Sequence, residues 1–77
     1  MKKIMYSYKD YKAVNDLAKK EGFRHSEFIG LLEGFSIFLV SKGNDGGKVG
    51  YPNYIAVKDG HARMLTYEER KKVTFEL

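Results

Sequence analysis

Cysteine is absent from this 77-residue chain, so neither disulfide bonds nor thiolate metal sites can stabilise it. At this length a single hydrophobic core is barely sufficient by itself. Small chains of this kind often gain stability by pairing with a second copy, and the aromatic content of 14% supplies apolar material for a core or a subunit interface. We therefore expect one small domain that forms a homodimer.

Long apolar runs are also missing. The longest, residues 37–40, is far shorter than the ~20 residues that a helix needs to cross a bilayer. Lys2 and Lys3 could open a signal peptide, but residues 6–16 are polar and offer no apolar core region. The sequence therefore predicts a cytoplasmic protein with no membrane partner.

Groups suited to catalysis are scarce. His25 and His61 are the only histidines, and neither has a carboxylate or nucleophile at a recognisable spacing. Two histidines without placed carboxylates are too few for a metal site. The glycine-rich residues 43–48 lack the Gly-Lys-Ser/Thr ending of a nucleotide-binding loop. We therefore expect no enzyme, no catalytic residue, no metal and no cofactor.

The net charge of +4 lies in the first third of the chain. Residues 1–25 hold seven basic and three acidic residues, whereas residues 26–77 hold seven of each. This asymmetry predicts an anionic partner, and nucleic acid is favoured over membrane because the basic segment lacks a broad apolar face. A solvated basic surface that only keeps the protein soluble is the alternative.

Residues 17–29 have the pattern of one helix ending and a second beginning. Residues 18–21 are good helix formers, and Gly22 follows where a left-handed residue after the helix is favoured. Ser26 is a strong N-cap candidate, and Glu27 suits the first helical turn. Apolar residues then recur at helical spacing from Phe28 to Phe35. Upstream, residues 2–7 predict a short strand and residues 7–10 a capping-box-like start to the first helix.

The segment that follows Ser26 has two interpretations. One is a second helix over residues 27–42. The other is two strands over residues 25–32 and 35–42, joined at Glu33-Gly34, since Gly30 and Gly34 disfavour a helix and the apolar residues also suit strands. The Ser26 cap, the upstream helix end and the apolar spacing favour the helix.

The strand–helix–helix order of residues 1–42 resembles the ribbon–helix–helix family of dimeric DNA-binding regulators, most closely in residues 18–22 and 26–29. The resemblance implies an α+β fold with a ribbon–helix–helix (β-α-α) N-terminal part. Two strands from two subunits would pair and enter the DNA major groove, where Lys3 and Met5 would contact bases. The implied function is a homodimeric, sequence-specific protein, acting as a transcriptional repressor on double-stranded DNA.

The resemblance also assigns the remaining site residues. The N-terminus of the second helix would hold a DNA phosphate through its free backbone N–H groups, with contacts from Arg24, His25 and Ser26. The dimer core would consist of apolar side chains from the strand and the second helix: Ile4, Tyr6, Phe28, Leu31, Leu32 and Phe35. The alternative function is a small protein-interaction module or inhibitor, such as one from a phage or plasmid, without DNA binding.

Residues 54–77 predict a C-terminal β-hairpin extension after a loop at residues 44–53; residues 1–43 would form the DNA-binding and dimerisation unit. Asp59-Gly60 is a preferred two-residue turn, and pairing outward from it sets Lys58 opposite His61. This register gathers four apolar residues on one face: Ile55, Val57, Ala62 and Met64. We expect the opposite face to be solvated. Residues 66–69 form a capping box that opens a helical turn through residue 72, and residues 73–77 alternate like a last strand.

Overall fold

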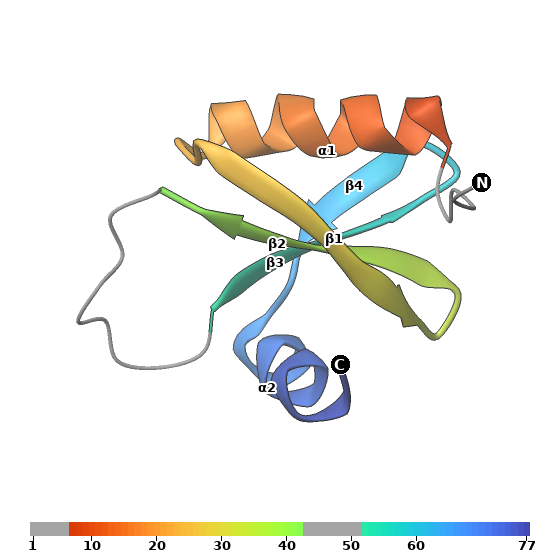
Figure 1. Cartoon of the computed structure of the whole chain (residues 1–77), viewed down its shortest axis with the longest axis vertical. Helices are drawn as coiled ribbons and strands as arrows, with labels where there is room; N and C mark the ends of the chain where they lie inside the picture. The colour runs from red at the N-terminus through yellow and green to blue at the C-terminus, as the bar shows by residue number, and fades with distance from the viewer. Residues whose placement is uncertain (1–6, 43–51) are drawn as a thin grey trace.

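The computed structural model describes residues 7–42 and 52–77 of the chain. The elements along the chain are α1 (Tyr8–Lys20), β1 (His25–Leu32), β2 (Phe35–Ser41), β3 (Asn53–Lys58), β4 (His61–Met64) and α2 (Tyr67–Glu76). The four strands form one antiparallel sheet in the order β1-β2-β3-β4. Figure 1 shows α1 on one face of this sheet and α2 on the other. The described part of the chain therefore has three layers.

Both ends of α1 follow local sequence signals. Ser7 Oγ accepts a hydrogen bond from the Asp10 backbone N–H at 3.1 Å, which satisfies one free donor of the first turn. At the other end Gly22 has φ +88°, and its N–H donates to the Lys19 carbonyl. The Phe23 N–H donates to the Ala18 carbonyl at 2.8 Å, which completes a Schellman motif. The predicted end of the first helix is confirmed.

The sheet has a core on each face. On the α1 side the buried residues are Val14, Ala18, Phe38, Val40, Ile55 and Val57. On the α2 side they are Ile37, Tyr54, Ala56 and Val73. Alternate residues of β2 and β3 contribute to the two cores, because successive side chains of a strand point to opposite faces.

The predicted helix over residues 27–42 is wrong. This segment forms β1 and β2, which pair from His25 with Ser41 to Leu32 with Phe35. Glu33 and Gly34 have φ values of +53° and +85°, as the tight turn of a two-residue hairpin requires. The order of the described elements is therefore α-β-β-β-β-α, and the β-α-α fold of a ribbon–helix–helix protein is contradicted. Residues 2–6 of the predicted strand 2–7 lie outside the described residues, and Ser7 is the N-cap of α1.

The C-terminal hairpin is confirmed with its register. Lys58 lies opposite His61 and Ile55 opposite Met64, as the Asp59-Gly60 turn predicted. The capping box is also present: Thr66 Oγ1 accepts from the Glu69 N–H, and the Glu69 carboxylate accepts from the Thr66 N–H. The helix it opens runs through Glu76, so the predicted last strand at residues 73–77 is wrong.

Candidate functional site

The outward side of α1 gathers exposed basic side chains. Val14 and Ala18 are buried against the sheet, and the opposite side of the helix faces solvent. We call this exposed set the basic face of α1; it comprises Tyr8, Lys9, Lys12, Lys19 and Lys20. Tyr8 is 78% exposed at its N-terminal end. A basic surface with an exposed aromatic ring is suited to an anionic partner.

The acidic residues of α1 only partly offset these lysines. Asp10 turns toward the sheet, where its Oδ1 accepts a 2.6 Å hydrogen bond from the Gly60 N–H. Asp16 pairs with Lys12 at 3.0 Å, and the pKa of Lys12 is raised by this hydrogen bond and by the charge of Asp16. Within residues 7–42 and 52–77, Lys19 and Lys20 form no salt bridge. The C-terminal half of the basic face therefore carries two exposed lysines that no salt bridge holds.

The residues predicted to contact phosphate lie next to that end of α1, but not at a helix N-terminus. Arg24 precedes β1, and its N–H donates to the Ser41 carbonyl at 2.9 Å. His25 and Ser26 are the first residues of β1, where Ser26 is half-buried opposite Val40. The row of free amides on which the phosphate site depended is therefore absent here. Arg24 and His25 are exposed, and their contact with DNA stays a prediction.

The other predicted site residues have different outcomes. Lys3, Met5, Ile4 and Tyr6 lie outside the described residues. Among the rest of the predicted dimer core, Phe28 packs edge-to-face on Phe38 with ring centroids 5.5 Å apart. Leu32 and Phe35 pack into the core on the α2 side, and Leu31 is 45% exposed. Three of these four side chains therefore pack within the subunit.

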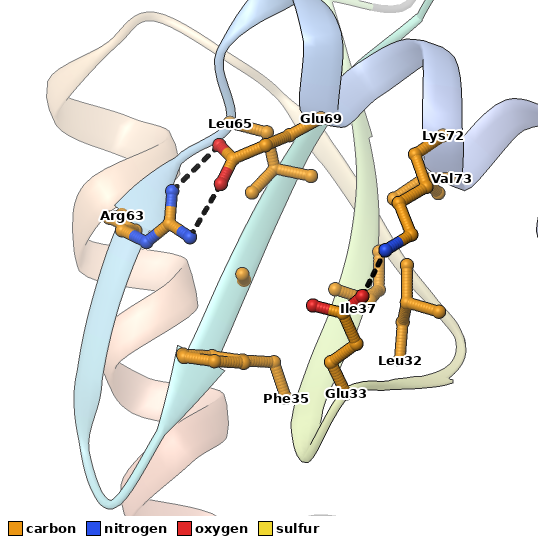
Figure 2. A pocket seen from close by; sticks show the side chains of 10 residues that line it. Leu32, Glu33, Phe35, Ile37, Arg63, Leu65, Glu69, Lys72 and Val73 are labelled. Carbon is orange, nitrogen blue, oxygen red and sulfur yellow. Dashed lines mark hydrogen bonds and ion pairs between the residues drawn. The ribbon is translucent and has the colours of Figure 1, made fainter.

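A pocket of about 70 Å³ opens between the sheet and α2 (Figure 2). We call it the α2-side pocket. Its wall is mainly apolar and comes from all four strands, their connections and the helix: Leu32, Phe35, Ile37, Ala56, Leu65 and Val73, with the charged residues Glu33, Arg63, Glu69 and Lys72. A pocket of this size accommodates one small apolar group.

Two ion pairs flank the α2-side pocket. Figure 2 shows the Arg63 guanidinium facing the Glu69 carboxylate, with two parallel hydrogen bonds of 2.8 Å. Arg63 lowers the pKa of Glu69 to about 2, and the Thr66 N–H adds to the effect. Lys72 pairs with Glu33 of the β1–β2 turn, which raises the pKa of Lys72. Arg63 is thus held by α2, contrary to the expectation of a solvated face.

Cations also lie over the aromatic ring of the pocket. The Lys58 Nζ is 5.6 Å and the Arg63 guanidinium carbon 5.7 Å from the centroid of Phe35, within the range of cation–π attraction. Sequence reasoning identified the capping box that places Glu69 and the hairpin that places Arg63, but not the pocket. The pocket depends on the β1–β2 hairpin, which brings Glu33 and Phe35 next to α2, and the sequence analysis favoured a helix over that hairpin.

Within the described residues, no three His, Asp or Glu side chains are grouped closely enough to hold a metal ion. No helix among them is long and apolar enough to cross a membrane. No family model matches this chain, and neither a curated protein nor a solved structure matches it. Among the described residues, the basic face of α1 and the α2-side pocket are the two features that bear on function.

Proposed function

We propose that this protein binds double-stranded DNA through the basic face of α1. The observation that carries the proposal is the exposure of four lysines on one side of a helix whose acidic Asp10 is turned inward. From Lys9 to Lys20 these side chains cover about 16 Å along the helix axis. A duplex carries one negative charge per ~1.7 Å of its axis when both strands are counted, so about ten phosphates lie along this length, some of them on the side that faces α1.

Lysine ammonium groups act here as point charges on phosphate oxygens. Such contacts position a protein on the duplex and carry no base information directly. Binding would release condensed counterions, which makes the affinity fall as salt rises. Tyr8 can donate from its hydroxyl to a phosphate at the N-terminal end of the same face.

The test is a fluorescence anisotropy titration with a labelled 20-base-pair duplex at several salt concentrations. Four phosphate contacts from one copy of the chain predict a slope of about −3.5 for log K against log salt, since each contributes about −0.9. Replacing Lys19 and Lys20 by Gln should reduce the magnitude of that slope to about 2. If the wild-type protein showed no salt-sensitive binding to the duplex, the proposal would be contradicted.

The control is the double substitution Lys58→Gln and Lys71→Gln. It removes the same total charge from two exposed residues outside α1, one in β3 and one in α2. If the basic face of α1 carries the binding, this control keeps the wild-type slope. If both double variants reduced the magnitude of the salt slope equally, binding would depend on the net charge of the protein and not on the basic face of α1.

The α2-side pocket favours a second candidate function, a protein-interaction module that receives one small apolar side chain of a protein partner. The substitution Leu32→Trp places a bulkier side chain in the pocket wall, whereas Leu31→Trp adds the same ring at an exposed neighbouring position. A partner that purifies in stoichiometric amounts with wild type and Leu31→Trp, but not with Leu32→Trp, would support this function. Loss with both variants would contradict it.

A further inference from the structure

The two edges of the sheet differ in length. β1 has eight residues and β4 has four. In the part of the chain that the structure describes, β1 pairs only with β2. An edge strand directs alternate backbone N–H and C=O groups away from the sheet, where they can pair with another strand, and a short edge offers fewer of them. β1 is therefore the longer edge of the sheet.

Of the residues that most often block such pairing, proline and lysine are absent from β1. Leu31 is 45% exposed on this strand. One irregularity is present, a bulge between Phe28 and Gly30. Since a bulge interrupts a ladder, the regular segment available to a second strand runs from His25 to Phe28.

We infer that two copies of this chain pair through antiparallel β1 strands, with Ser26 on the two-fold axis. In a two-fold antiparallel pair, one residue lies opposite itself. With Ser26 there, His25 lies opposite Glu27 of the second copy, twice, and an imidazole N–H can donate to the carboxylate. An axis at Glu27 would set two carboxylates opposite each other, which is unfavourable. An axis at Phe28 would set the bulge residue Ile29 into the ladder.

This pairing has a consequence for the proposed DNA-binding surface, and only that consequence rests on the proposed function. Neighbouring antiparallel strands of one sheet are related by a two-fold axis perpendicular to the sheet. The two copies would thus form a continuous eight-stranded sheet with both α1 helices on the same side. Each dimer would present two basic faces to one duplex, with both copies of α2 on the far side.

A disulfide test follows from the register, because the chain has no native cysteine. In the variant Ser26→Cys the two Cβ atoms would lie about 4.5–5.5 Å apart, near disulfide geometry. In the control Leu31→Cys they would lie about 30 Å apart, five residues from the axis on each strand. Under mild oxidation most of Ser26→Cys should run as a covalent dimer on a denaturing, non-reducing gel, and Leu31→Cys should show no covalent dimer.

Light scattering on the wild-type chain and two charge variants supplies an independent readout. Wild type should have the mass of a dimer at tens of micromolar. Glu27→Arg should raise the dimer Kd at least tenfold, because it removes the acceptor opposite His25. Glu68→Arg makes the same charge change in the first turn of α2, next to β4 at the other edge of the sheet, and should leave the Kd unchanged. A monomeric wild type, or crosslinking of Leu31→Cys without Ser26→Cys, would overturn the inference.

The outcomes separate this inference from the proposed function. A dimer that crosslinks through residue 26 but binds no duplex supports the pairing and removes the DNA-binding proposal. A monomer that binds duplex with the single-copy salt slope keeps the DNA-binding proposal and removes the pairing.

Discussion

Asp10 Oδ1 accepts a 2.6 Å hydrogen bond from the backbone N–H of Gly60, a residue fifty positions away in the sequence. Asp10 lies in the first turn of α1, and Gly60 lies in the turn between β3 and β4. A capping box would point this carboxylate back to its own helix start. Here it instead joins α1 to the far end of the sheet, and it keeps a negative charge off the basic face of α1.

Asp10→Ala should destabilise the protein. Loss of the carboxylate leaves the Gly60 N–H without its partner, and a hydrogen bond to a charged group contributes about 1.5–3 kcal/mol. Urea denaturation measures the free energy of unfolding. The control is Asp16→Ala, which removes only a surface ion pair with Lys12 and should cost less than ~1 kcal/mol. Equal losses of unfolding free energy in the two variants would show that the bond to Gly60 contributes no more than a surface ion pair.

Gly60→Ala tests the backbone of the same turn. Gly60 has φ +80°, and an added Cβ would lie 2.5 Å from Lys9 Cε. The flexible end of Lys9 can move aside, so the cost should come from the left-handed backbone, about 1–2 kcal/mol. The same loss is expected in a Lys9→Ala background, with a coupling below ~0.5 kcal/mol. A loss that disappears in that background would assign the cost to the side-chain clash.

The C-terminal hairpin could be predicted because its signals are local. Asp59-Gly60 fixes the turn, and the turn fixes which residues of β3 and β4 face each other. The capping box of α2 is equally local. These features do not depend on what the rest of the chain does.

The β1–β2 hairpin was the less favoured of two interpretations of residues 25–42, because β2 is buried on both faces. Ser36, Ile37 and Phe38 are consecutive and all buried, so the alternation that marks a half-exposed strand is absent. Such an apolar run cannot be told from a buried helix by periodicity. Its two-sided burial arises from α2, whose packing on the second face is not visible in the sequence. The lysines of α1 were predictable as a charged surface, whereas the α2-side pocket depends on all four strands.

Glu33→Asn should relieve a strained turn. Glu33 has φ +53°, a conformation that Asn tolerates better than Glu. The expected gain is about 0.5–1 kcal/mol, but the substitution also removes the ion pair with Lys72. The comparison is therefore made in a Lys72→Ala background, where that pair is already gone. Thermal or urea unfolding should show the gain there, and a loss of stability in that background would contradict the turn assignment.

Glu69 predicts an acid-dependent part of the stability. Its pKa is about 2 in the folded protein and 4.5 ordinarily, because Arg63 and the Thr66 N–H hold the carboxylate. Since the folded pKa is the lower one, the stabilisation is complete above pH ~5 and is lost as the pH falls toward 2. The Glu69 side chain is 38% exposed, so solvent screening limits the contribution to about 1 kcal/mol or less.

Glu69→Gln isolates this effect, because Gln can keep the capping box while it removes the charge. The urea midpoint of wild type should fall more between pH 6 and pH 3 than that of Glu69→Gln. Glu68→Gln, which removes a neighbouring exposed carboxylate of the same turn, should keep the wild-type pH response. High salt should narrow the difference between wild type and Glu69→Gln, since it screens an exposed ion pair. If the urea midpoint of Glu69→Gln fell with pH as much as that of wild type, the acid sensitivity would arise from other carboxylates. The ion pair between Arg63 and Glu69 would then add no net stability.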